Sequence, residues 1–157
     1  MAALAGIQSK EAIVFLISML PVLELRGGFL AASWLGIPLY RAAFACIGGC
    51  LLPVPFILLL IRGVLGRMKR YRVTKRLADY VEKRAMGKSD EIRKYEFWGL
   101  MLFVGIPLPG TGAWTGSLIA ALLGIRFSRA VAAIFIGVLI SAALMAGLSY
   151  GILDLIL

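Results

Sequence analysis

The amino-acid sequence predicts an all-α integral membrane protein built as an inverted repeat. Three observations support this fold class: an unusually apolar composition, two long apolar segments interrupted by proline and glycine, and a match between the two halves of the chain. Hydrophobic residues make up 61% of the 157 residues and charged residues 16%, whereas soluble domains are about 45–50% apolar and about 25% charged. A chain this short cannot bury so much apolar surface, so we expect lipid to cover part of it.

The charge distribution predicts how the protein is oriented. The chain has 17 basic and 8 acidic residues, and most of the net charge of +9 lies in residues 62–96. A basic segment flanked by apolar ones is retained in the cytoplasm, where it also attracts anionic lipid heads. We therefore expect a multi-pass protein of the cell membrane with a cytoplasmic basic loop. Nucleic-acid binding is the weaker interpretation, because no nucleic-acid motif accompanies the charge.

Two apolar segments read as simple spanning helices. Residues 42–61 carry no charge and, at about 1.5 Å per residue, cover the roughly 30 Å of a hydrocarbon core; residues 130–153 are similar. Pro53 and Pro55 lie inside the first segment and should kink it.

The apolar segments 12–39 and 97–125 are each interrupted by helix breakers, at residues 21–28 and 107–116. Each arm is long enough to cover only about half of the hydrocarbon core. We therefore predict two re-entrant hairpins that dip to mid-membrane and return. One long kinked helix per segment is the alternative.

The two halves of the chain match each other without a gap when residues 20–49 are aligned with residues 108–137. The matched pairs include Pro21/Pro109, Gly28/Gly116, Gly36/Gly124, Arg41/Arg129 and Gly49/Gly137. Such self-similarity indicates a tandem repeat. A hairpin plus one spanning helix makes an odd number of crossings, so the two copies must be inverted, as in secondary transporters with midplane binding sites. Both termini then lie outside.

The predicted organisation is one membrane domain over residues 1–157, with repeat 1 at 11–62, a cytoplasmic linker at 63–96 and repeat 2 at 97–157. Within the linker we expect an amphipathic helix that begins at Thr74, ends at Gly87 and lies on the inner leaflet. Tyr95, Phe97 and Trp98 should form an aromatic belt at the membrane surface.

Enzymatic and metal chemistry have little support in the sequence. The chain has no histidine, and its two cysteines, Cys46 and Cys50, are too few for a metal site, so we interpret them as core residues. No serine is paired with a base. We expect no cofactor and no enzymatic activity.

Glu24 and Arg26 are charges in the middle of an apolar segment. A charged residue at a helix centre costs about 2.5–3.5 kcal/mol on insertion scales, so the two together mark a candidate functional site. Gly27 and Gly28 follow directly and predict a non-helical tip, in which Glu24 and Arg26 would share a face. The alternative is a mutual ion pair that only holds the hairpin together.

The second interruption carries no charge but could bind a ligand through backbone N–H groups, hydroxyls and an indole. A helix N-terminus beside glycines suits an anion, and an aromatic wall suits an apolar or cationic ligand. Close contact between hairpins or protomers is the alternative, since Gly112/Gly116 and Gly147/Gly151 have the spacing of helix packing. The candidate residues here are Pro107, Pro109, Gly110, Thr111, Gly112, Trp114 and Thr115.

The Glu-Leu-Arg-Gly-Gly sequence at residues 24–28 and the Pro-Leu-Pro-Gly-Thr-Gly-Ala-Trp-Thr-Gly-Ser sequence at residues 107–117 resemble the signatures of the small multidrug export proteins of bacteria and archaea. The resemblance implies export of small drugs. The layout is also similar to the wider DedA family, which implies two opposed re-entrant hairpins and lipid-carrier flipping, with Glu24 as the membrane acid. The arginines of the second DedA hairpin are missing here, which argues against a phosphate-bearing substrate.

We therefore expect an ion- or proton-coupled transporter that exports a small amphipathic or drug-like substrate. A DedA-like flippase or scramblase of lipids or lipid carriers is the alternative. The expected partners are membrane lipids, the substrate and a second copy of the chain in a homodimer packed through small residues.

Overall fold

The computed structural model describes residues 2–70, 75–76, 79–80, 83, 96–108 and 110–156, and all regular structure in this part of the chain is helical. Tyr95, Pro109 and most of the linker helix expected between Thr74 and Gly87 lie outside these residues. The helices are α1 (Ala2–Met19), α2 (Glu24–Trp34), α3 (Leu39–Leu51), α4 (Pro53–Arg70), α7 (Phe97–Gly105), α8 (Ala113–Leu123) and α9 (Phe127–Ile156).

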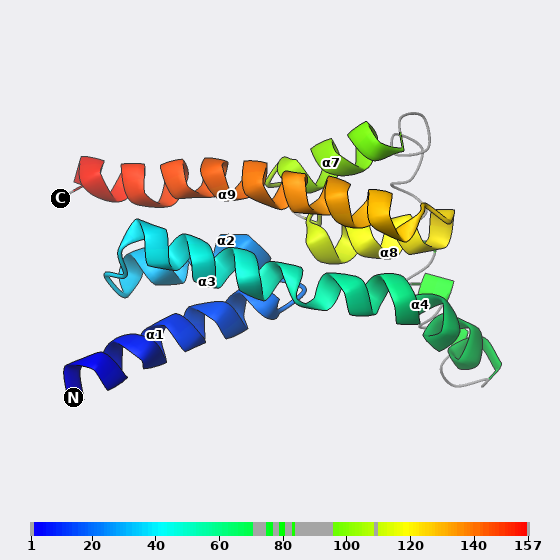
Figure 1. Cartoon of the computed structure of the whole chain (residues 1–157), viewed down its shortest axis with the longest axis horizontal. Coiled ribbons are helices and arrows are strands. Elements are labelled where there is room, and N and C mark those ends of the chain that lie inside the picture. Colours follow the sequence, from blue (N-terminus) through cyan, green and yellow to red (C-terminus); the bar gives the residue numbers. More distant parts are fainter. Residues whose placement is uncertain are drawn as a thin grey trace.

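The helices form an elongated molecule in which the chain reverses direction twice near the middle (Figure 1). From the N-terminal end α1 runs to the middle, α2 returns, and α3 and α4 then cross to the opposite end. From that end α7 runs to the middle, α8 returns, and α9 runs back along the length of the molecule. Both chain termini therefore lie at one end, and the basic end of α4 lies at the other.

The aligned Leu-Gly-Ile sequences of the two halves form the same turn. After α2, Gly36 has φ +67° and the Ile37 N–H donates to the Ala32 carbonyl at 3.0 Å. After α8, Gly124 has φ +77° and Ile125 donates to Ala120 at 3.0 Å. This left-handed glycine and its backbone bond are typical of a helix C-terminus. The sequence match thus corresponds to a shared local structure.

The prolines in residues 42–61 were expected to kink one helix, and the structure instead has two helices that meet there. α3 ends at Leu51 and α4 begins at Pro53, which has no N–H to donate. Leu52 between them keeps helical angles and donates to the Gly48 carbonyl at 3.0 Å, so the chain continues in the same general direction. The stretches Leu39–Ile61 and Phe127–Gly151 are both long and apolar enough to cross a membrane.

Small residues let the helices pack closely. α1 packs on α3 and α7 packs on α9, while α2 contacts α1, α3 and α9. A Cβ added at Gly49 would collide with the Phe15 carbonyl oxygen of α1. Cys46 and Cys50 are buried among these helices, which confirms that they are core residues. The largest fully buried side chains include Phe29, Leu100, Ile119 and Ile134.

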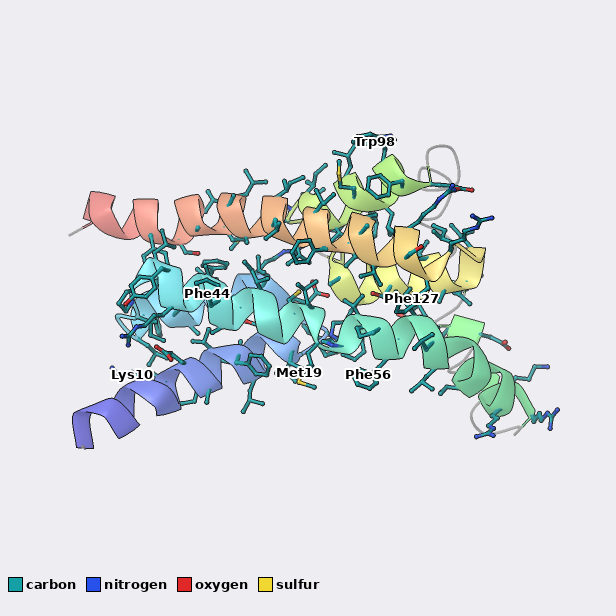
Figure 2. The ribbon with its side chains drawn as sticks, in the orientation of Figure 1. Lys10, Met19, Phe44, Phe56, Trp98 and Phe127 are labelled. Carbon is teal, nitrogen blue, oxygen red and sulfur yellow. The ribbon has the colours of Figure 1, made fainter. Side chains whose placement is uncertain are left out.

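The outer surface carries many large apolar side chains. Trp34 is 92% exposed, Val22 89% and Phe44 80%, and side chains such as Phe44, Phe56 and Trp98 project outward from the helices (Figure 2). A monomeric soluble protein rarely exposes so much contiguous apolar surface. Together with the two apolar stretches, this surface indicates a membrane protein.

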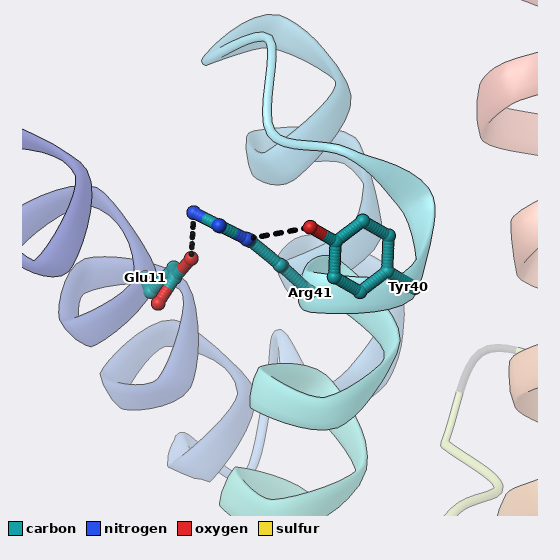
Figure 3. A network of polar contacts seen from close by, with 3 residues as sticks. All are labelled: Glu11, Tyr40 and Arg41. Atoms are coloured by element: carbon teal, nitrogen blue, oxygen red, sulfur yellow. Dashed lines mark hydrogen bonds and ion pairs between the residues drawn. The ribbon is translucent and has the colours of Figure 1, made fainter.

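Among the described residues, each hairpin is connected by an ion pair to the helix that follows it. Arg41 at the start of α3 lies 3.4 Å from the Glu11 carboxylate of α1 and donates to the Tyr40 hydroxyl at 3.0 Å (Figure 3). The aligned Arg129 at the start of α9 lies 3.6 Å from Glu96, just before α7. Exposed pairs of this kind contribute little to stability, so they orient the helix ends more than they stabilise the fold.

Candidate functional site

The candidate site lies where the two chain reversals meet in the middle of the molecule. The first reversal, residues 20–23, joins α1 to α2, and the second, residues 106–112, joins α7 to α8. Hydrogen bonds link the first turn of α2 to the second reversal and to the start of α8. The segments 21–28 and 107–116 therefore contact each other.

Glu24 is the first residue of α2, and its side chain points to the start of α8. The residue is 7% exposed, and Oε1 accepts a hydrogen bond from the Trp114 N–H at 3.1 Å, with the Ala113 N–H also facing the carboxylate. The positive end of a helix dipole favours a negative group in this position. The backbone N–H groups at the start of α8 therefore face a carboxyl group of the chain itself, that of Glu24.

Gly112 makes room for this carboxylate. It precedes α8 with φ +146°, a conformation that side-chain-bearing residues rarely adopt. A Cβ added at Gly112 would overlap Oε2 of Glu24. Glu24 itself has φ +45°, an uncommon value for a residue other than glycine. Both backbones therefore adopt unusual conformations at the contact between the hairpins.

Arg26 also contacts the second hairpin. Its Nη2 donates to the carbonyl oxygen of Thr111 at 2.9 Å and lies 3.0 Å from the Thr111 hydroxyl. The same hydroxyl accepts from the Leu108 N–H and lies within hydrogen-bond distance of the Ile106 and Leu108 carbonyl oxygens. Thr111 therefore organises the second reversal and holds Arg26 against it.

Within the described residues, the side-chain hydrogen bonds of Glu24 and Arg26 go to the opposite hairpin and not to each other. These contacts differ from the alternative interpretation, in which Glu24 and Arg26 form an ion pair with each other inside the first hairpin. The two charges instead bind neighbouring parts of residues 111–114, so removing either one should loosen the contact between hairpins.

Trp114 is held by the first hairpin at two points. Its backbone N–H donates to Glu24 at 3.1 Å, and its indole Nε1 donates to the carbonyl oxygen of Met19 at 3.0 Å. Sequence reasoning missed Met19 because a backbone carbonyl can come from any residue type, so no sequence signal could have identified it.

The expectation that Gly27 and Gly28 form a non-helical tip is wrong, because both lie within α2. Their missing side chains serve packing: a Cβ at Gly28 would collide with Ser18 Oγ and lie 2.8 Å from Cys46 Sγ. Of the other candidate residues, Pro107 and Gly110 lie in the second reversal and Thr115 lies in the first turn of α8.

A small cavity lies beside the Glu24 carboxylate. It has a volume of about 10 Å³, and its lining includes Glu24, Arg26, Cys50 and Ser141. Such a volume holds about one water molecule. The site as it stands therefore accommodates a proton or a water molecule and excludes any organic substrate.

A much larger apolar groove is lined in part by Trp114. Its volume is about 320 Å³, and Met19, Trp114 and one side of α4 line it. Figure 2 shows Met19 and Phe56, two of the lining residues, close to the break between α3 and α4. Sequence reasoning missed this groove. The available signal was that the apolar residues that line it in α4 recur every third or fourth position, and so lie on one side of the helix.

A family model described as "Putative small multi-drug export protein" matches residues 24–144. The chain belongs to this family. The family match begins at Glu24, directly after the first reversal, and includes the second reversal. A search of curated proteins and a search of solved structures gave no match. Membership in the export family is therefore shown, whereas the resemblance to the DedA family has no such support.

Proposed function

We propose that this member of the export family is a proton-coupled transporter of a small amphipathic substrate, with Glu24 as the coupling group. One observation carries the proposal: a buried carboxylate holds the two hairpins together by accepting the Trp114 N–H. A carboxylate binds a helix N-terminus more strongly than a neutral carboxyl group does. Protonation of Glu24 would therefore weaken the contact between hairpins and let them separate.

The transport cycle rests on an inverted-repeat architecture with two re-entrant hairpins. The matching turns at Gly36 and Gly124 support it. The packing also supports it, because α1 contacts α3 as α7 contacts α9, and α2 contacts α9 as α8 contacts α4. With the basic end of α4 in the cytoplasm, both termini lie outside and the hairpin tips lie near the midplane.

In this proposal the described conformation is occluded. The cavity of about 10 Å³ beside Glu24 is too small for a substrate. Substrate passage would then require the contacts of Trp114 with Glu24 and Met19 to open, together with that of Arg26 with Thr111. Coupling follows if opening depends on whether Glu24 carries a proton.

The test is export of fluorescent amphipathic dyes of either charge from proteoliposomes under an imposed pH gradient. Glu24→Gln keeps the shape of the side chain but cannot take up or release a proton, so we expect it to abolish pH-dependent flux in protein that remains folded and inserted. Glu11→Gln is the matched control, because it changes an acid in the ion pair with Arg41, at the end of the first hairpin. It should leave the pH dependence unchanged.

A double variant distinguishes coupling from a structural role. If Glu24 and Arg26 only hold the hairpins together, replacing both with leucine should restore stability and activity, as apolar replacements of buried charges often do. Full pH-dependent export by Glu24→Leu/Arg26→Leu would contradict the proposal.

Lipid flipping is the second candidate function, and the open apolar groove along α4 favours it. The same vesicles test it when they contain a fluorescent phospholipid that a membrane-impermeant reductant bleaches in the outer leaflet. Protein-dependent loss of the inner-leaflet signal without dye export would support flipping over export. In either function we expect a homodimer, and the open faces of Gly147 and Gly151 on α9 offer room for a second copy.

A further inference from the structure

The apolar groove along α4 has the length of one membrane leaflet. One wall of the groove is formed by Leu52 and by α4. Its side chains lie at four successive levels along the helix: Leu52 and Pro53, Phe56 and Ile57, Leu60 and Ile61, and Val64. From Leu52 to Val64 the helix rises about 18 Å, and half of a hydrocarbon core is about 15 Å. The groove therefore matches an extended acyl chain in length and in chemistry.

The two ends of the groove differ. At the end near the middle of the molecule, Met19 and Trp114 line it. At the other end, Arg67 follows Val64 by three residues on the same side of α4, and Arg70 follows after three more. Both arginine side chains are exposed. An apolar groove that leads to two arginines is complementary to a molecule with a chain at one end and an anion at the other.

We propose that an anionic phospholipid binds along α4, with an acyl chain in the groove and its phosphate group at Arg67 and Arg70. Arginine binds phosphate oxygens in a bidentate manner, and basic groups at the membrane surface favour anionic lipids. The described lining residues include no acid that would attract a cationic amphiphile. This lipid site is separate from the Glu24 site and does not depend on the proposed transport activity.

Tryptophan fluorescence can test the site. The Trp34→Phe/Trp98→Phe variant leaves Trp114 as the single tryptophan, and both replaced residues are exposed, at 92% and 62%. This variant is reconstituted in two kinds of vesicle with the same proportions of zwitterionic and anionic phospholipid. The distal half of the acyl chains carries bromine, a contact quencher, on the anionic lipid in one kind and on an equal amount of zwitterionic lipid in the other.

We expect brominated anionic lipid to quench Trp114 more strongly than brominated zwitterionic lipid does. Each arginine should raise the affinity of the site for anionic over zwitterionic lipid about fivefold. Arg67→Gln/Arg70→Gln should remove the preference. Arg126→Gln/Arg129→Gln is the control, because it removes the same charge at the same end of the molecule but at the start of α9 (Figure 1). The control variant should keep the preference.

A second pair of variants tests the groove itself. Leu60→Phe fills the groove and should reduce quenching by anionic lipid, whereas Leu59→Phe adds the same volume at a neighbouring residue outside the lining. Equal quenching by the two lipids would overturn the anionic site. Quenching unaffected by Leu60→Phe would overturn the assignment of the acyl chain to the groove. Quenching that falls as the protein-to-lipid ratio rises would mean that a second copy of the protein covers the groove instead of a lipid.

Discussion

Gly112 is the residue that allows a carboxylate from one hairpin to reach the helix N-terminus of the other. Gly112→Ala would place a methyl group onto Glu24 Oε2 and would force a side-chain-bearing residue to φ +146°. We expect it to destabilise the protein by more than about 2 kcal/mol, from overpacking and backbone strain together. Thermal unfolding in detergent measures this loss.

Gly63→Ala is the control for Gly112→Ala, because a Cβ at Gly63 meets nothing within 4 Å. It should leave the melting temperature unchanged or raise it slightly, since alanine favours a helix over glycine. Equal melting temperatures for the two alanine variants would contradict the close contact between Gly112 and Glu24.

Thr111 supplies the hydroxyl that supports Arg26. Thr111→Val keeps the shape of the side chain but removes a group within hydrogen-bond distance of Arg26 and of two backbone carbonyls. We expect a loss of about 1–2 kcal/mol and reduced export activity. Thr115→Val, one turn into α8, makes the same chemical change away from Arg26 and should have a smaller effect on both quantities.

The two charges of the site could be identified from the sequence, but their partners could not. Glu24 and Arg26 stand out because charges are costly inside an apolar segment. Thr111 is 85 residues from Arg26, and Trp114 is 90 residues from Glu24. Contacts at such separations depend on how the two hairpins meet, which local patterns do not encode. The repeat indicated that the tips are equivalent, but only the structure pairs their atoms.

At the scale of helices, the contact between α1 and α3 depends on Gly49. Gly49→Ala would push a methyl group against the Phe15 carbonyl oxygen, so the two helices would have to move apart. We expect a loss of stability of about 1–3 kcal/mol, which chemical or thermal unfolding can measure. Gly63→Ala in α4 meets nothing within 4 Å and should be stabilising by up to about 1 kcal/mol. Destabilisation of the same size in both variants would contradict this packing.

The helix boundaries show what sequence patterns can and cannot supply. The proline break at residue 53 and the glycine turns at residues 36 and 124 were predictable, because these residue types act locally. The first tip was predicted at residues 21–28, yet α2 begins at Glu24. Gly28, one of the two glycines that suggested a longer tip, is required by its neighbours Ser18 and Cys46, which only tertiary structure brings to it.

At the scale of the whole molecule, the arrangement predicts which positions share a side of the membrane. In a background without Cys46 and Cys50, Arg70→Cys should react with an impermeant thiol reagent only from the cytoplasm, and Leu39→Cys only from outside. The physical reason is that α3 and α4 carry these positions to opposite ends of the molecule (Figure 1), and the positive-inside rule favours the cytoplasm for the basic end. Labelling of both positions from the same side of sealed vesicles would rule out this topology.

Trp114 connects the Glu24 site with the apolar groove along α4. Its N–H donates to the carboxylate of Glu24, and the residue also lines the groove. A molecule in the groove that displaces the backbone of Trp114 would also displace its N–H, and binding of that molecule would then be thermodynamically linked to protonation of Glu24. Linkage is reciprocal: if protonation changes the affinity of the groove by some factor, occupancy changes the proton affinity of Glu24 by the same factor. The composition of the surrounding bilayer would then set the pH range in which this protein works.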